Sequence, residues 1–371
     1  MFAKGQTVIQ FLEQLAPKHY AMPDDKIGLQ LGTLHKEIKK VMIALDVVDA
    51  VVDEAIEQEV DLIIAHHAII YRPLLNIQTD TPAGRLYEKL IKHDIAVYIA
   101  HTNLDVAEGG INDMMAEAIG LTDLKLLTET QTELLKKLIV YVPEDYQLLV
   151  QQAMFNAGAG TMGQYSHCSF TSAGTGSFLA EAEAEPFIGK IGKIERVTEM
   201  RLETIVPARL ERKVIQAMLK SHPYEEVAYD LYTLDRIGRT FGLGRVGKLP
   251  DQILLEDLAE KVKSAFEVPR VRVVGDLQRS ISKVAVLGGA GSHYLKQAYF
   301  AGADVLITGD IDYHSAQDAL ANGLAIIDPG HNVEKIMKTH ISSYMEKQLL
   351  KYKYATVVIS SGVNTEVFQF V

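Results

Sequence analysis

Short apolar runs alternate with amphipathic segments in the first third of the chain. The runs cover residues 41–46, 62–65 and 96–100, and the segments 49–58 and 81–93 between them have the pattern of helices. Four or more apolar residues in a row are typical of a strand buried on both faces of a parallel sheet. Strands separated by helices of about 10–15 residues form the βαβ pattern. Residues 1–129 are therefore predicted to be the first half of an α/β domain.

The same pattern returns near the end of the chain. Apolar runs at 283–287, 304–308 and 324–327 predict three strands, and a run at 355–359 predicts a late fourth strand. Residues 237–371 thus form a predicted second half. The fold class is α/β, with two similar three-layer halves that build one domain.

A repeat with a constant offset of 64 residues occupies the middle of the chain. The recurring positions are Leu138, Val142, Pro143, Val150, Gln152, Ala153 and Met154. Each copy predicts a strand, a proline at the start of a helix, and a helix, followed by a second strand near 174–179 or 226–232. Two such β-α-β units predict a ferredoxin-like α+β domain, inserted at 130–236. Chance identity is the alternative explanation of the repeat.

Histidine and acidic residues follow three of the predicted buried strands. They are His66, His67, His101, Asp105, His331 and Glu334. Because the carboxyl ends of parallel strands meet at one edge of a sheet, we expect these side chains to converge there. A single histidine in such a place is more often a hydrogen-bonded structural residue. Four together with two carboxylates indicate a metal site.

The spacing of these residues agrees with metal binding. His101 and Asp105 are four residues apart, and His331 and Glu334 are three apart, which are facing offsets on a helical turn. Imidazole and carboxylate ligands suit Zn, Fe, Mn, Ni or Co rather than Ca or Cu(I). Six groups exceed the needs of one tetrahedral ion. We therefore expect two divalent ions per chain, Zn, Fe or Mn, separated by ~3.5–4 Å.

Three further features have a functional and a structural interpretation. Gly288, Gly289, Gly291 and Ser292 form a glycine-rich turn that could hold a phosphate, or simply a tight turn between strand and helix. His314 could carry a proton, or could be only an early-helix residue. Residues 242–247 match the dinucleotide pattern by letter, but no helix opens after them, so we interpret them as the loop that returns from the inserted domain.

Composition narrows the class of protein. The 371 residues include one cysteine, Cys168, which excludes an intrachain disulfide and a thiolate-rich metal site and favours a cytoplasmic location. No apolar run approaches the ~20 residues of a membrane helix, and no signal-peptide pattern precedes the first amphipathic segment. The net charge of -11 argues against a nucleic-acid binder that relies on a broad positive field, although a local basic patch remains an alternative.

Several short stretches together resemble the Nif-three-like family, also known as GTP cyclohydrolase type 2 homologues. They are 25–29 (DKIGL), 44–46 (ALD), 66–67 (HH), 101–105 (HTNLD), 242–245 (GLGR), 308–310 (TGD) and 328–331 (DPGH). The family more often has asparagine where this chain has Lys26. The middle of the chain resembles the PII/CutA-like module of longer bacterial members, through 222–226 (HPYEE).

The resemblance implies a dinuclear metal centre at the junction of the two halves. The family's metal ligands fall on His66, His67, Asp105, His331 and Glu334, with His101 adjacent. The resemblance also implies a homohexameric ring whose metals face an internal cavity.

Two functions follow as hypotheses. The first is a metal-dependent hydrolase acting on a nucleotide or a small heterocyclic or phosphorylated substrate, with GTP as the named candidate. Water activated by metal ligation would attack an electrophilic carbon such as C8 of guanine, His101 or His314 would carry the proton, and the turn at 288–292 would hold phosphate. The second is a ring-shaped regulatory or metal-binding scaffold without hydrolytic activity. An open coordination position would favour the enzyme, and a closed one the scaffold.

Overall fold

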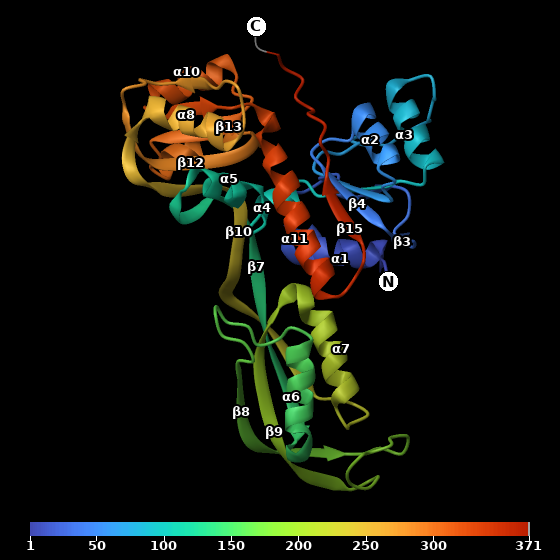
Figure 1. Ribbon diagram of the computed structural model, residues 1–371. Coiled ribbons are helices and arrows are strands. Elements are labelled where there is room, and N and C mark those ends of the chain that lie inside the picture. Colours follow the sequence, from blue (N-terminus) through green and yellow to red (C-terminus); the bar gives the residue numbers. More distant parts are fainter. Residues whose placement is uncertain (370–371) are drawn as a thin grey trace. The chain divides into compact units, whose positions relative to one another are not determined.

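The computed structural model describes residues 1–369 and divides into two compact units (Figure 1). The first unit comprises Met1–Thr130 together with Phe241–Val371, and the second comprises Gln131–Thr240. Helices and sheets are mixed in both, so the α/β class is confirmed. Within the described residues, no helix combines the length and apolar character needed to cross a membrane.

The first half of the first unit is built on a five-stranded sheet in the order β15-β4-β5-β6-β2. Its central strands β4 (Lys40–Ala44), β5 (Leu62–Ala65) and β6 (Ala96–Ile99) are parallel. At the edges, β2 (Gly28–Leu31) is antiparallel to β6, and β15 (Val357–Ser360) is parallel to β4. The run at 355–359 was expected in the second half, and that expectation is wrong. The reason is α11 (Met337–Lys351), which packs on β4 and β15 and returns the chain to the first sheet.

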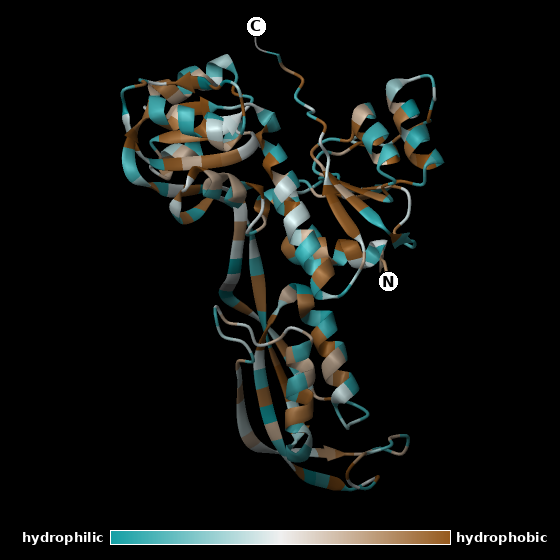
Figure 2. Cartoon of the chain, viewed as in Figure 1, coloured by the Kyte–Doolittle hydropathy of each residue, from teal (hydrophilic) through white to brown (hydrophobic). Residues whose placement is uncertain are grey.

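The central strands of this sheet are apolar along their whole length because both faces are covered. Met42, Ile63 and Val97 pack toward α2 (Asp49–Glu57) and α3 (Pro82–Lys92). Their neighbours Ile43, Ile64 and Tyr98 pack on the opposite side, in the cluster that includes α1 (Gly5–Leu15). In Figure 2 the strands are accordingly brown, whereas the helices carry teal stripes on their outer sides. The remaining short elements are β1 (Ala3–Lys4), β3 (Glu37–Ile38), α4 (Thr102–Val106) and α5 (Ile111–Ile119).

The second half has its own parallel strands, β12 (Ser280–Ala290), β13 (Val305–Gly309) and β14 (Ala325–Asp328). Antiparallel strands flank them: β11 (Arg272–Val274) pairs with β14, and β10 (Tyr229–Leu254) pairs with β12. The helices are α8 (Leu255–Ala265), α9 (Leu295–Phe300), α10 (Tyr313–Ala321) and α11. Residues 242–247, expected to be a loop, instead lie within β10. Gly242 is needed there because a Cβ would come within 1.9 Å of the Thr128 carbonyl oxygen.

The second unit contains the later part of β7 (Thr122–Pro143), α6 (Gln147–Asn156), β8 (Ser169–Leu179), β9 (Ile194–Pro207), α7 (Glu211–Ser221) and the start of β10. Its strands are hydrogen-bonded in the order β10-β7-β9-β8. The repeated residues of the sequence occupy equivalent core positions. Val150 in α6 and Val214 in α7 are fully buried, as are Met154 and Met218.

Candidate metal centre

The adjacent histidines lie where β5 ends, and their rings are held differently. His66 is fully buried, and its Nδ1 lies 2.8 Å from the carbonyl oxygen of Ala100. A carbonyl only accepts, so Nδ1 donates and Nε2 keeps its lone pair. His67 turns the other way, with its Nδ1 2.6 Å from Oδ1 of Asp46, which follows β4. The two imidazoles therefore present their Nε2 atoms to the same region.

Two more histidines have the same arrangement. Nδ1 of His101, which follows β6, lies 2.9 Å from Oδ1 of Asp25. Nδ1 of His331, which follows β14, lies 2.7 Å from Oδ2 of Asp310 at the end of β13. All four imidazoles are thus anchored through Nδ1. An outer hydrogen bond that fixes the ring and leaves Nε2 available is typical of metal-binding histidines.

Two buried carboxylates complete the cluster. Oε2 of Glu334 lies 3.1 Å from Nε2 of His67, 3.3 Å from that of His331 and 3.5 Å from that of His66. Oδ1 of Asp105 lies 3.7 Å from Nε2 of His66, and both of these buried atoms lack a hydrogen-bond partner. An unsatisfied lone pair facing an unsatisfied carboxylate oxygen is costly unless a cation lies between them. The residues present therefore fit a divalent metal ion.

The ligand atoms form three overlapping groups, each within 4.8 Å. They are His66 with His67 and His101, His67 with His331 and Glu334, and His66 with Asp105 and Glu334. All five predicted metal ligands, together with His101, are brought together in these groups.

The pKa values of the cluster indicate the same need for positive charge. Burial alone would lower the pKa of His67, but hydrogen bonds to Asp46 and Glu334 outweigh it and raise the value to about 10. The hydrogen bond to Glu334 raises the pKa of His331 to about 9. Burial raises the pKa of Asp105 to about 6, whereas Glu334, despite its burial, is held well below its usual range by His66. The buried carboxylates therefore stabilise positive charge among the imidazole rings, which is the electrostatic environment that a divalent cation requires.

Comparison with known proteins identifies the family. The family model of Duf34/NIF3 (NGG1p interacting factor 3) matches residues 3–366. The chain belongs to the Duf34/NIF3 family. This confirms the resemblance found in the sequence.

Relatives match over the full length. Proteins named "GTP cyclohydrolase 1 type 2 homolog" from Halalkalibacterium halodurans and Bacillus subtilis are each 53% identical, covering 100% and 99% of this chain and 99% and 98% of their own. The crystal structure of a Bacillus cereus protein related to NIF3 is 49% identical, with a TM-score of 0.94 and complete coverage of both chains.

The glycine-rich turn at 288–292, predicted to bind phosphate, lies against the candidate metal centre. A Cβ on Gly288 or Gly289 would lie 3.1 or 3.0 Å from Oε1 of Glu334. A Cβ on Gly291 would lie only 2.2 Å from Oγ1 of Thr308, and Ser292 opens a short 3-10 turn. Gly288 and Gly289 thus make room for the Glu334 carboxylate, and the role of the turn in binding phosphate stays a prediction.

His314 lies apart from the three ligand groups. It is exposed near the start of α10, where its backbone N–H donates to Asp312. Its predicted role as a proton carrier is untested.

A cavity of about 360 Å³ opens beside the cluster. Its walls include Asp46, His67, His101 and His331, together with residues 365–368 near the C-terminus. The hydroxyl of Thr365 donates to Asp46, which fastens this segment to the site. Among the residues that line the cavity there is no lysine or arginine.

Sequence reasoning missed the residues that hold the ligands. Asp25, Asp46 and Asp310 were noticed only as parts of short stretches, without a role. Asn112 was not noticed at all, although its buried amide joins the two halves: it donates to the carbonyl of Asp105 and accepts from the N–H of Gly288. The available signal was position, since Asp46 and Asp310 each end a buried strand.

Proposed function

We propose that the cluster is a dinuclear centre for two divalent ions, Zn, Fe or Mn, held by His66, His67, Asp105, His331 and Glu334. The observation that carries the proposal is the pair of partnerless buried atoms, Nε2 of His66 and Oδ1 of Asp105. The overlap of three ligand groups around shared residues supports two ions rather than one.

We further propose that the protein is a metal-dependent hydrolase of a nucleotide or a small heterocyclic substrate. Divalent ions in such a site supply Lewis-acid polarisation and activate water for attack near neutral pH. The chain's own residues would orient the substrate in the adjacent cavity. His101, which faces that cavity and is oriented by Asp25, is the proposed proton carrier, with His314 as the alternative. GTP is the first substrate to test, because the curated relatives carry the name GTP cyclohydrolase 1 type 2 homolog.

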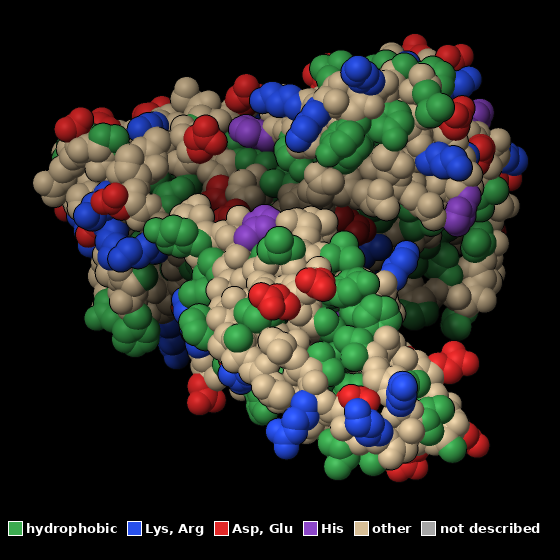
Figure 3. Space-filling model, turned by 90° about the horizontal axis from the view of Figure 1, so that it is seen from below, with side chains coloured by type: hydrophobic (Ala, Val, Ile, Leu, Met, Phe, Trp, Pro, Cys, Tyr) green, Lys and Arg blue, Asp and Glu red, His purple; other side chains and the backbone are tan. Residues whose placement is uncertain are grey.

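The second candidate function is a regulatory scaffold. It is favoured by a separate cavity in the unit at 131–240, remote in sequence from the metal ligands. We propose that residues 130–236 are an inserted PII/CutA-like ferredoxin-like domain, supported by the element order and the strand order β10-β7-β9-β8. Acidic and basic side chains are interspersed on the face shown in Figure 3, which gives a nucleic-acid role no support there.

We also propose a cytoplasmic homohexamer, with the single cysteine as support for the compartment. Light scattering at micromolar concentration tests the assembly. A 41.0 kDa particle that does not change when metal is added would contradict it.

The deciding experiment combines metal analysis with a turnover screen on the full-length chain. After reconstitution with Zn, Mn or Fe, we expect two ions per chain in the wild type and fewer in His67→Ala and Asp105→Ala. His35→Ala is the matched control, because His35 is exposed and lies outside the ligand groups. Turnover of GTP or a related heterocycle should disappear with a chelator and return with metal.

The outcomes separate the two candidates. Metal binding without turnover in the screen would favour the scaffold over the enzyme. Equal metal content in the wild type and both ligand variants would contradict the metal centre itself.

A further inference from the structure

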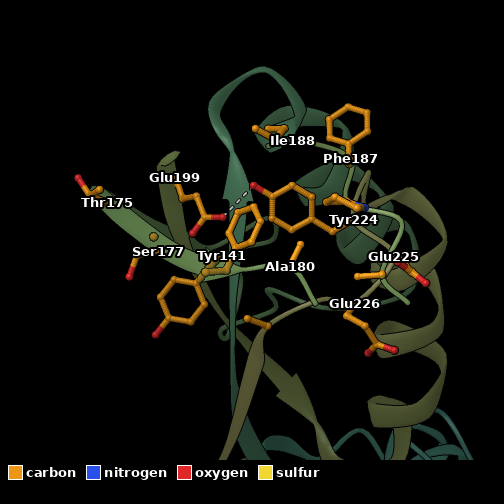
Figure 4. Close-up of a pocket in the computed structure, with 16 residues that line it drawn as sticks. Tyr141, Thr175, Ser177, Ala180, Phe187, Ile188, Glu199, Tyr224, Glu225 and Glu226 are labelled. Atoms are coloured by element: carbon orange, nitrogen blue, oxygen red, sulfur yellow. Dashed lines mark hydrogen bonds between the residues drawn. The ribbon is translucent and has the colours of Figure 1, made fainter. Parts of the chain in front are cut away.

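A second cavity, of about 520 Å³, lies wholly within the unit at 131–240 (Figure 4). It is bounded by β8, by β9, by the segment at 180–188 and by the segment that precedes β10. Four aromatic residues, Tyr141, Phe178, Phe187 and Tyr224, form part of its wall. The rings of Phe187 and Tyr224 are 6.3 Å apart at their centroids. The cavity thus has an aromatic interior of the size that holds small organic ligands.

A carboxylate is fixed at one side of this cavity. Glu199 on β9 accepts a hydrogen bond from the hydroxyl of Tyr224 at 3.0 Å. The neighbouring strand carries Gly176, whose missing side chain leaves the space for this carboxylate: a Cβ there would lie 2.1 Å from Oε2. Any other residue at 176 would displace Glu199. The hydroxyl of Tyr224 and the space left by Gly176 therefore together fix the position of the Glu199 carboxylate.

Two more carboxylates lie on the other side. Figure 4 shows Glu225 and Glu226 on the far side of the Tyr224 ring from Glu199. In the described part of the chain none of the three forms an ion pair with a lysine or arginine, and the lining contains neither residue type. They also do not approach one another closely enough to form a metal-binding group. Negative charge thus brackets an aromatic surface at two separated places.

We propose that this cavity binds an aliphatic amine that carries two or more ammonium groups along a methylene chain. One ammonium group pairs with Glu199 and another with Glu225 or Glu226, while the methylene groups and the charge lie against the aromatic rings. A compact metal dication cannot reach both sides at once. A single ammonium group engages only one. This site is independent of the proposed hydrolase and of the metal centre.

Calorimetric titration of the full-length protein with spermidine tests the proposal. Butylamine and Mg²⁺ are the comparison ligands, at constant ionic strength near 0.15 M so that general screening is equal. We expect spermidine to bind at least about tenfold more tightly than either, and Glu199→Gln to weaken it by about tenfold, the loss of one charge-assisted contact. Tyr224→Phe, which keeps the ring but frees Glu199, should produce a smaller loss.

Glu144→Gln is the matched control, because Glu144 is an exposed acid of the same unit outside the cavity lining. It should leave spermidine binding unchanged. A melting curve for each variant separates lost binding from lost folding. The proposal is overturned if Mg²⁺ or butylamine binds as tightly as spermidine, if Glu144→Gln and Glu199→Gln lose affinity equally, or if a folded wild-type protein binds no spermidine.

Discussion

Replacing Asn112 by leucine should weaken both the fold of the first unit and the metal centre, although Asn112 is not a ligand. Its side chain is fully buried near the start of α5 and makes two hydrogen bonds, to the carbonyl of Asp105 and from the N–H of Gly288. Leucine has the same number of side-chain heavy atoms and the same branching at Cγ, so its two methyl groups occupy the places of the amide oxygen and nitrogen. The change therefore removes polar contacts without opening a cavity.

The magnitude follows from how deeply each partner is buried. The Asp105 carbonyl is buried and loses its amide donor, which costs about 1–3 kcal/mol, and the part-buried Gly288 N–H adds about 0.5–1.5 kcal/mol. The sum is about 1.5–4.5 kcal/mol. For a unit of about 260 residues, an unfolding entropy of about 2.1 cal/mol/K per residue converts this into a Tm lower by about 3–8 °C. Metal affinity should fall by about 10–100-fold, as for other residues that orient ligands.

Differential scanning calorimetry of the metal-free and metal-loaded protein measures the first effect, and competition with a chromogenic chelator measures the second. Asn322→Leu is the control. Asn322 is exposed at the end of α10, so its replacement should change stability by less than about 0.5 kcal/mol. A variant at 112 that melts within about 1 °C of the wild type, with unchanged metal affinity, would refute the reasoning.

Three further predictions concern other parts of the molecule. Burial lowers the pKa of His222, so the free energy of unfolding of the second unit should be highest above about pH 6.5 and should decrease as the pH falls below that value. In His222→Asn the urea-unfolding midpoint should depend less on pH between about pH 5 and 6.5 than in the wild type. Gly289→Ala places a Cβ 3.0 Å from Glu334 at a backbone φ of +65°, so it should lower the free energy of unfolding by about 1–2 kcal/mol and reduce the metal content. Gly323→Ala is the control: its backbone is also left-handed but has open space around it, so only the free energy of unfolding should fall. Chelation should lower the Tm of the reconstituted wild type but not that of His67→Ala; equal shifts in both would place the stabilising metal elsewhere.

The strands that the sequence predicted well are those buried on both faces. β4, β5, β6, β13 and β14 are short and almost wholly apolar, and β12 contains such a run within its longer span. Runs of that length between helix-like segments are typical of buried parallel strands. The pattern fails to say which sheet a strand joins. The run at 355–359 is apolar enough to be a strand, but its partner β4 lies more than 300 residues earlier in the chain. The pairing depends on α11, which packs on β4 and leads the chain back to that sheet.

The long strands β7 and β10 were recognised only in part. Much of each is half-exposed, so their residues mix polar and apolar types without a continuous run. Residues 242–247 in β10 were interpreted as a loop because no helix follows their glycine pattern. Each of the glycines at 242, 244 and 247 lies where a Cβ would meet a neighbouring segment at less than 3 Å.

The ligands could be predicted because topology gathers them. His66 and His67 follow β5 and His101 follows β6, two neighbouring parallel strands whose ends meet at one edge of the first sheet. His331 follows β14 of the other sheet, so its place beside them depends on how the two halves dock. The aspartates that orient them could not be assigned, because Asp46 and Asp310 also follow buried strands and are of a residue type that binds metals. Only the structure distinguishes them: their oxygens lie 2.6 and 2.7 Å from Nδ1 atoms, outside the ligand groups.

Glu334 explains why the centre requires both halves of the first unit. Its carboxylate belongs to the second half, yet it lies within 3.5 Å of the Nε2 atoms of His66 and His67 from the first half and of His331 from its own. Asn112 adds a second, uncharged connection between the same halves through Asp105 and Gly288. An ion bound among these groups must therefore stabilise the docking of the two sheets as well as its own ligands, since binding energy that exists only in the docked state is also docking energy. Loss of the metal should consequently lower the stability of the whole first unit rather than only that of the residues around the ion.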